Sequence, residues 1–148
     1  MRSQVVRTFE RVDRSEGPTP LAAAIRSLLR KVVEPSGIPT HLDYRLDEEP
    51  APAARTVVYR IVEEALINVQ QHAGARGVVI AVEWQDGGVL VTIEDNGAGF
   101  DPVRAFEPSD VHLGLQVMLE RAQMSGGWLR ADSAIGQGTT IEFWIPSS

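Results

Sequence analysis

The sequence has no cysteine, and only one of its 14 basic residues is a lysine. The absence of cysteine excludes a disulfide framework, a thiolate metal site and a cysteine nucleophile. A Walker-type phosphate loop requires a lysine directly after its glycines, whereas Lys31 lies in the segment LLRKVVE, which contains no glycine. The sequence therefore excludes this class of nucleotide-binding site.

Long apolar runs are also absent from the chain. There is no stretch of about 18 apolar residues, which argues against a membrane-spanning helix, and residues 1–17 lack the apolar core of a signal peptide. The net charge of −6 argues against a general surface for nucleic acid or anionic membranes. We therefore expect a cytoplasmic protein that makes no direct contact with nucleic acid or membrane.

The remaining composition is typical of one globular domain. A length of 148 residues with 43% hydrophobic and 23% charged residues suits a single hydrophobic core. We interpret residues 1–20 as a linker or frayed connector helix before a domain at 21–148. The order of elements predicts an α+β fold with helices on one face of a mixed sheet. The predicted helices span 21–33, 52–73 and 114–125, and the predicted strands span 40–46, 78–84, 89–95, 128–133 and 139–145.

The most informative segment is the predicted helix over residues 59–73. Its apolar residues recur every three or four positions, as in a helix that packs on a core. Glu64, Asn68 and His72 lie one turn apart along the edge of this apolar stripe, whereas Glu63 points towards solvent. A carboxylate, a carboxamide and an imidazole in a row are equally compatible with a binding site and with ordinary polar residues beside a core.

Asp95 ends the predicted strand VLVTIED. It shares the parity of Val89, Val91 and Ile93, so it faces the helices if these apolar residues do. A buried carboxylate is costly unless a donor satisfies it. The alternative is a turn aspartate that bonds the loop backbone after Asn96, and the strand alone favours this alternative.

A loop of roughly 15 residues follows Asp95, and loops of this length in compact domains are usually functional or mobile. Gly97 and Gly99 open the loop, and Leu113–Leu115 closes it at the start of the next predicted helix. Glycine permits hinge motion and close backbone approach, and the amides at a helix N-terminus bind phosphate. Together these features predict a nucleotide with its purine at Asp95 and its phosphates at the loop and the helix start.

Thr139 begins the last predicted strand and shares a parity with Ile141, Phe143 and Ile145. Its hydroxyl would then point inward and assist Asp95 in holding a polar ring. An ordinary β-branched residue at a strand start explains Thr139 at least as well.

These segments resemble the ATP-binding catalytic domain of bacterial sensor histidine kinases. This domain belongs to the GHKL superfamily, which also includes type II topoisomerases, large heat-shock chaperones and mismatch-repair ATPases. The resemblance implies a two-layer α/β sandwich of the Bergerat type. The YRIVEEAL and MLERAQMSGGWL segments are most similar to the nitrate-sensor-like subfamily, whose kinases pair with helix-turn-helix response regulators. The matching segments, in the family's order over about residues 55–146, are YRIVEEALINVQQHA, EDNGAGFDP, HLGLQVMLERA and IGQGTTIEFWIP.

The resemblance implies ATP and Mg²⁺ as ligands and a role for each matching residue. Asn68 matches the asparagine that holds Mg²⁺ against the nucleotide phosphates, and Glu64 matches the catalytic acid that polarises the attacking group or a water. Asp95 matches the aspartate that accepts the adenine amino proton. Thr139 matches a threonine beside the adenine, and His72 matches a residue near the phosphates.

The glycines match the hinges of a lid over the nucleotide. Gly97 and Gly99 correspond to the first hinge and Gly114 to the second, and Leu113 and Leu115 complete the second nucleotide-binding segment.

The implied activity is transfer of the γ-phosphoryl group of ATP to a histidine on a separate dimerisation domain, in the same full-length protein or in trans. A helix-turn-helix response regulator is the further implied partner. None of His41, His72 and His112 lies in an acidic, arginine-rich acceptor motif. We therefore expect an excised catalytic domain, such as the cytoplasmic part of a membrane-bound sensor, or a chain that uses an acceptor in trans.

Two alternatives share this fold. A stand-alone serine kinase of the anti-sigma-factor type is favoured by the missing acceptor histidine, whereas the YRIVEEAL and LERA segments argue against it. A non-catalytic ATP-sensing module is suggested by Gln71, where many relatives have lysine or arginine, and by a second glycine box with Gly114 as its single glycine.

Overall fold

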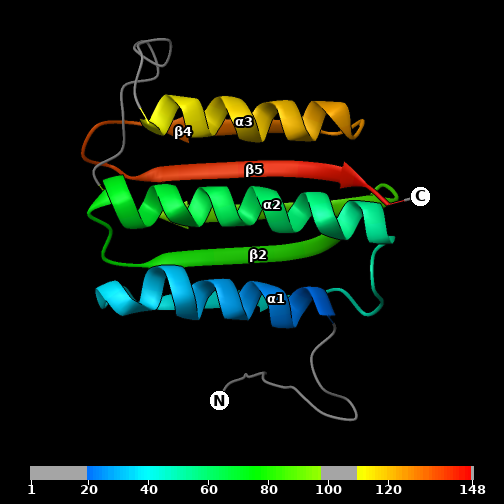
Figure 1. The fold of residues 1–148 in the computed structure, drawn as a ribbon, viewed down its shortest axis with the longest axis horizontal. Helices are drawn as coiled ribbons and strands as arrows, with labels where there is room; N and C mark the ends of the chain where they lie inside the picture. The colour runs from blue at the N-terminus through cyan, green and yellow to red at the C-terminus, as the bar shows by residue number, and fades with distance from the viewer. Residues whose placement is uncertain (1–19, 98–109, 148) are drawn as a thin grey trace.

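Three α-helices lie side by side across one face of a five-stranded sheet (Figure 1). The computed structural model describes residues 20–97 and 110–147, without the side chains of residues 72, 73 and 110–112. This architecture confirms the predicted α+β fold. The helices are α1 (Pro20–Leu28), which continues as η2 (Leu29–Val33) and η3 (Glu34–Ser36), α2 (Pro52–Asn68), which continues as η4 (Val69–Ala73), and α3 (Asp110–Met124). The strands are β1 (Thr40–Tyr44), β2 (Val78–Gln85), β3 (Gly88–Asp95), β4 (Trp128–Ser133) and β5 (Thr139–Pro146).

The strand order across the sheet is β1-β2-β3-β5-β4. β1 and β2 are parallel, as strands joined through a helix can be, and the other neighbours are antiparallel. The predicted mixed sheet is therefore confirmed. The register pairs Asp95 with Val78 of β2 on one side and with Thr139 of β5 on the other. The end of β3 thus lies between two strand ends, in the middle of one end of the sheet.

α2 lies over the middle of the sheet and supplies the centre of the core. Val58, Ile61 and Val62 of α2 are fully buried, which confirms the predicted apolar stripe. Ile80 and Val82 of β2 are fully buried in the same cluster. Each side chain of this kind stabilises the fold by roughly 1.5–3 kcal/mol when it is fully buried.

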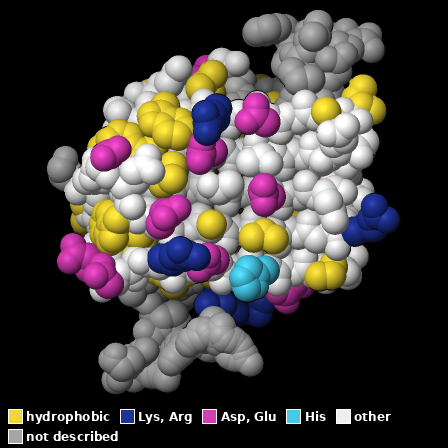
Figure 2. Space-filling model, turned by 180° about the vertical axis from the view of Figure 1, so that it is seen from behind, with side chains coloured by type: hydrophobic (Ala, Val, Ile, Leu, Met, Phe, Trp, Pro, Cys, Tyr) yellow, Lys and Arg dark blue, Asp and Glu magenta, His cyan; other side chains and the backbone are white. Residues whose placement is uncertain are grey.

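The other face of the sheet is open, and Figure 2 shows acidic, basic and hydrophobic side chains intermixed on it. Val79, Glu83 and Glu94 alternate with buried residues of β2 and β3 and are exposed. His41 of β1 is exposed as well. Within residues 20–97 and 110–147, no helix has both the length and the apolar character needed to cross a membrane.

The turn between β2 and β3 confirms the predicted hairpin. Asp86 and Gly87 have φ values of 51° and 75°, and positive values at both central residues are typical of the type I′ turn. Gly88 precedes the strand predicted at residues 89–95 but already belongs to β3. A Cβ atom at Gly88 would lie 2.6 Å from the indole of Trp144, so the glycine leaves room for that ring.

The start of α3 differs from the prediction. The helix begins at Asp110 rather than at Gly114, so Gly114 lies in its second turn. The prediction interpreted Gly114 as a flexible point that closes the loop at the start of the helix. A tertiary contact explains the glycine instead, since a Cβ atom there would lie 2.9 Å from side-chain atoms of both Glu64 and Asn68. α3 ends close to the predicted position, before Gly126, whose φ is 85°.

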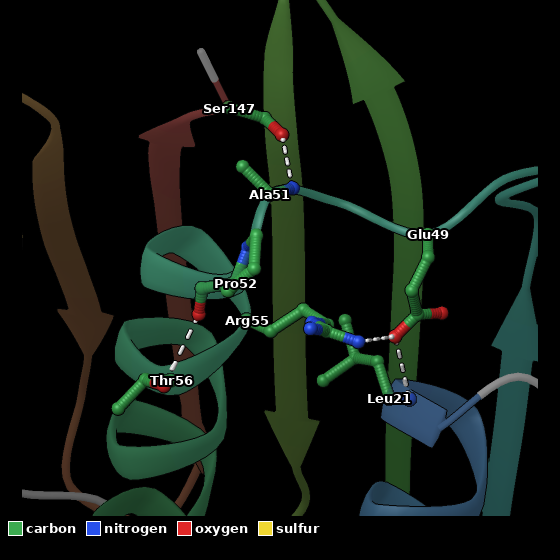
Figure 3. A network of polar contacts seen from close by, with 7 residues as sticks. All are labelled: Leu21, Glu49, Ala51, Pro52, Arg55, Thr56 and Ser147. Atoms are coloured by element: carbon green, nitrogen blue, oxygen red, sulfur yellow. Dashed lines mark hydrogen bonds and ion pairs between the residues drawn. The ribbon is translucent and has the colours of Figure 1, made fainter.

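Glu49 joins α1 to α2 at the end of the sheet opposite to Asp95 (Figure 3). Its Oε2 atom accepts the backbone N–H of Leu21 at 3.0 Å and lies 3.3 Å from Nη1 of Arg55. Nearby, the hydroxyl of Ser147 accepts the backbone N–H of Ala51 at 2.9 Å. These contacts hold the loop before α2 against the start of α1 and the residue that follows β5.

Candidate functional site

Several predicted site residues lie at one end of the sheet. β3 ends there at Asp95, β5 begins at Thr139, and α2 changes to η4 after Asn68. The first turn of α3 lies at the same end (Figure 1). Four segments that are distant in the sequence therefore meet at one place.

Asp95 is half-buried and continues the parity of the fully buried Val89 and Val91. Its Oδ1 atom accepts the backbone N–H of Gly97 at 2.8 Å. Burial raises the pKa of the Asp95 carboxyl above its ordinary value, and hydrogen bonds from the backbone of Gly97 and of Thr139 oppose this rise. Both interpretations of this residue therefore hold, since it is partly withdrawn from solvent and also bonds its own turn.

Thr139 lies opposite Asp95 in the register of β3 and β5. Its hydroxyl is 2.9 Å from the hydroxyl of Ser133, which also donates to the carbonyl oxygen of Gly138 at 3.0 Å. The described contact between Thr139 and the Asp95 carboxylate involves the threonine backbone. A role of Thr139 beside a purine stays a prediction.

The turn between β4 and β5 lies directly on the end of β3. Gly138 has a φ of 83°, and a Cβ atom there would lie 2.1 Å from the carbonyl oxygen of Asp95 and 2.9 Å from Cα of Asn96. No other residue fits at this position without moving the backbone of Asp95. Sequence reasoning missed Gly138, although the closely spaced glycines of the segment AIGQGT were a signal of tight backbone contact.

Glu64 and Asn68 converge on α3. An ideal Cβ atom at Gly114 would lie 2.9 Å from Oε2 of Glu64, 2.9 Å from Nδ2 of Asn68 and 3.0 Å from Oδ1 of Asn68. The neighbouring Glu63 instead forms an ion pair of 3.2 Å with Arg60. The structure therefore confirms that Glu64, and not Glu63, lies on the same side of α2 as Asn68.

The helix widens immediately after Asn68. Residues Val69–Ala73 form a π-helical turn, and such turns frequently occur at functional sites. The hydrogen bonds of a π-helix join residues five apart, whereas those of an α-helix join residues four apart. The π-helical turn therefore does not maintain the predicted spacing of one α-helical turn between Asn68 and His72. The side chain of His72 and all of Gly99 lie outside the described residues, and their roles stay predictions.

The oxygens of Glu64 and Asn68 are the kind of ligand that Mg²⁺ prefers. In the part of the chain that the structure describes, no group of three or more His, Cys, Asp or Glu side chains could hold a metal ion. A cation beside Asn68 would take its other ligands from phosphate and water, which is usual for Mg²⁺. The residues present therefore fit a magnesium–nucleotide complex better than a metal held by protein alone.

Residues 53–148 match the family model described as histidine kinase-, DNA gyrase B-, and HSP90-like ATPase. This match covers more than half of the chain and includes Glu64, Asn68, Asp95 and Thr139. The chain belongs to this ATPase family. The resemblance found in the sequence is thereby confirmed.

This ATPase domain is similar to sensor kinases from several bacteria. It is 36% identical over 128 residues to the signal transduction histidine-protein kinase/phosphatase UhpB of Salmonella typhimurium, a match that covers 85% of the chain and 24% of UhpB. It is 33% identical over 133 residues to the oxygen sensor histidine kinase NreB of Staphylococcus carnosus, which covers 85% of the chain and 36% of NreB. The ATPase domain therefore spans only a minor part of the length of these relatives.

Solved histidine kinase structures share the fold of this ATPase domain. The histidine kinase domain of the blue-light activated kinase EL346 of Erythrobacter litoralis matches with a TM-score of 0.70 and 21% identity, covering 97% of this chain and 68% of that one. The mycobacterial sensor histidine kinase MprB matches with a TM-score of 0.63 and 23% identity, covering 84% of this chain and 92% of that one. At these identities the likeness concerns the fold alone.

Proposed function

We propose that this domain binds Mg-ATP and donates the γ-phosphoryl group to an acceptor histidine on a separate dimerisation domain. The observation that carries the proposal is the convergence of Glu64 and Asn68 on Gly114, at the same end of the sheet as the half-buried Asp95. For this reaction the domain must supply a hydrogen-bond acceptor for the purine amino group, which is the proposed role of Asp95. It must also supply a carboxylate and a carboxamide beside the metal ion and the phosphates, which are the proposed roles of Glu64 and Asn68. Membership of the ATPase family and the names of the relatives support the proposal.

Asp95 is proposed to accept a hydrogen bond from the adenine amino group. The backbone N–H groups of Gly97 and Thr139 already bond this carboxylate, so it is oriented before a ligand binds. Its partial burial strengthens a hydrogen bond because the surroundings are less polar than water. Gly97 and Gly99 would form the first hinge of a lid, and Thr139 would lie beside the purine.

Asn68 is proposed as the Mg²⁺ ligand, with His72 and Leu113–Leu115 near the phosphates. Because α3 begins at Asp110, the described amides that lack an intrahelical partner belong to residues 110–112. These amides, at the positive end of the helix dipole, are suited to an anionic group. In the proposed second hinge segment, Gly114 leaves space for the side chains of Glu64 and Asn68 from α2.

Glu64 is proposed as the catalytic residue that orients and polarises the acceptor imidazole or a water. It precedes Asn68 by one helical turn and reaches the same part of α3. When bound, Mg²⁺ supplies positive charge that offsets the charge of the transferring phosphoryl group. The side chains of the domain act mainly by positioning the nucleotide and the acceptor, which is the principal requirement in phosphoryl transfer.

The proposed partners are a histidine-containing dimerisation domain and a helix-turn-helix response regulator, in the cytoplasm. UhpB and NreB are both named as histidine kinases, which favours this function over an anti-sigma-factor-type serine kinase. Gln71 still motivates the non-catalytic ATP-sensing alternative, since it leaves the phosphate charge less neutralised than a lysine or arginine would.

The test is incubation of the domain with Mg²⁺, γ-labelled ATP and a separate dimerisation domain that carries the acceptor histidine. We expect label on that histidine and its loss when Glu64→Gln replaces the catalytic acid. Glu63→Gln is the matched control and should retain transfer, because Glu63 pairs with Arg60 and is not among the groups nearest to Gly114. Tight ATP binding without any transfer would support the ATP-sensing alternative instead.

A further inference from the structure

The side chain of Asn96 bonds the backbone of a distant segment. Its Oδ1 atom accepts the backbone N–H of Arg76 at 2.7 Å, across a sequence separation of 20 residues. Asn96 directly follows Asp95, and Arg76 lies in the linker 74–77 between η4 and β2. The contact therefore joins the residue after β3 to the segment before β2.

This bond continues the pairing of β2 and β3 beyond the ends of the strands. The last backbone pair of the two strands is Val78 with Asp95. Beyond this pair, the side chain of Asn96, rather than a backbone group, accepts the hydrogen bond from the linker. Its Nδ2 atom lies 4.0 Å from an ideal Cβ position at Gly77, so the carboxamide lies beside the linker.

The linker connects the two halves of the candidate site. It follows η4, which continues the helix that carries Asn68, and it leads into β2, the strand that pairs with Asp95. Gly74 ends η4 with a left-handed conformation at φ 58° and ψ 34°. Ala75 packs against the core. The bond to Asn96 fixes the next residue of the linker beside the purine end of the site.

We propose that Asn96 is a positioning residue that fixes the spacing between the purine end at Asp95 and the metal end at Asn68. The inference rests on the proposed function, because that function assigns the two ends. Asn96 acts through the backbone of Arg76 and not through contact with the ligand. Mg-ATP spans both ends and depends on this spacing, whereas adenosine has no phosphates and uses only the end at Asp95.

The chain offers matched variants for a test of this role. Asn96→Asp keeps an acceptor oxygen for the Arg76 N–H, whereas Asn96→Ala removes it. Glu94→Ala is the control, because Glu94 and Asn96 have the same parity at the end of β3 and are both exposed. None of these substitutions removes a buried side chain, so the fold should be retained in each.

The experiment measures Mg-ATP and adenosine affinities by calorimetry and the exchange rate of the Arg76 amide by NMR. Asn96→Ala should weaken Mg-ATP binding about threefold to tenfold, the factor that corresponds to one hydrogen bond. Adenosine affinity should stay unchanged, and the Arg76 amide should exchange faster. Asn96→Asp should show the wild-type Mg-ATP affinity and the wild-type exchange rate of the Arg76 amide at roughly 0.5 M salt, which screens the added charge. Glu94→Ala should match the wild type in all three measurements.

Equal losses for Mg-ATP and adenosine in Asn96→Ala, or an unchanged exchange rate of the Arg76 amide, would overturn the inference. The same loss in Glu94→Ala would overturn it too, because the effect would then not belong to the bond. A wild-type domain that binds neither ligand would overturn the proposed function and this inference with it. A wild-type domain that binds Mg-ATP, with unchanged binding in Asn96→Ala, would overturn this inference alone.

Discussion

The backbone of Gly138 lies directly against the backbone of Asp95, so closely that a Cβ atom at Gly138 would lie 2.1 Å from the Asp95 carbonyl oxygen. The hydroxyl of Ser133 bonds the carbonyl of Gly138 and supports this turn from β4. The backbone of Thr139, the next residue, bonds the Asp95 carboxylate. The turn between β4 and β5 therefore fixes the orientation of the group proposed to recognise the purine.

The first prediction separates this contact from the conformational preference of glycine. Gly136 and Gly138 both have left-handed φ values, 82° and 83°, but nothing lies within 4 Å of an ideal Cβ at Gly136. The left-handed backbone alone should lower the free energy of unfolding by about 1–2 kcal/mol in each alanine variant, and Gly138→Ala should lose more because its Cβ also meets the backbone of Asp95. Gly138→Ala must also displace Asp95, so its ATP affinity should fall by an order of magnitude or more. Urea denaturation and calorimetry measure the two effects, and an equal loss of ATP affinity in Gly136→Ala would contradict the prediction.

The second prediction concerns the purine acceptor itself. Asp95→Asn should abolish ATP binding, because an amide can present an N–H group to the adenine amine and is the weaker acceptor. The amide oxygen can still accept the N–H of Gly97, so the turn should be retained. Glu94→Gln, an exposed neighbour on β3, should leave ATP affinity unchanged. Calorimetry that shows wild-type affinity in Asp95→Asn would refute the adenine assignment.

The third prediction is a pH dependence with a defined sign. Burial raises the pKa of Asp95, so the folded domain binds this proton more readily than the unfolded chain does. This group therefore lowers stability as the pH rises through its folded pKa, and the loss is absent below the ordinary aspartate value of about 4. Without ligand, Asp95→Asn should be at least as stable as the wild type at neutral pH, and this difference should shrink on acidification. Urea denaturation across this range measures the difference.

The same shift has the opposite consequence for ligand binding. Adenosine needs the ionised carboxylate as acceptor, so its affinity should fall on acidification at a pH above the ordinary aspartate value of about 4. Adenosine is the suitable probe because ATP carries phosphates that titrate themselves. An affinity that stays constant down to the ordinary aspartate pKa would contradict the assignment of Asp95.

Periodicity was sufficient to predict most of the fold, because each element buries one face. The stripe of α2 depends only on residues three or four apart, and the same spacing distinguishes Glu64 from Glu63. The parity of β3 likewise directed Asp95 to the helix side. These properties are local, so the sequence contains them in full.

Contacts between distant segments could not be predicted in the same way. The bond of Asn96 to Arg76 and the contact of Gly138 with Asp95 depend on how separate elements approach one another. The boundary of α3 was wrong for the same reason, since Gly114 lies within the helix in contact with side chains of α2 rather than at its start. Local propensity is a weak guide where a tertiary contact selects the residue.

The fourth prediction tests the contact between α3 and α2. Gly114→Ala would favour the helix by about 1 kcal/mol through propensity, but its Cβ would displace the side chains of Glu64 and Asn68. We therefore expect a free energy of unfolding close to that of the wild type, together with a loss of phosphotransfer by an order of magnitude or more. Urea denaturation and transfer of labelled phosphate provide the two measurements. Wild-type transfer in Gly114→Ala would show that the convergence of these side chains is not needed.

The last prediction concerns the far end of the sheet, where Glu49 joins α1 to α2 (Figure 3). Glu49→Ala removes the acceptor for the Leu21 N–H, which lies in the first turn of α1, and the ion pair with Arg55. We expect a loss of about 1–2 kcal/mol in the free energy of unfolding, mostly from the uncapped helix start, because partly exposed ion pairs contribute little.

Two further variants identify the source of that loss. Glu49→Gln keeps an acceptor for Leu21 and should lose less than half as much stability, and Glu48→Ala changes an exposed neighbour and should lose almost none. ATP affinity should be unchanged in all three variants, because Glu49 lies at the opposite end of the sheet from Asp95. Equal losses in Glu49→Gln and Glu49→Ala would instead assign the stabilisation to the charge of Glu49, because both variants remove that charge and only Glu49→Gln retains the hydrogen-bond acceptor.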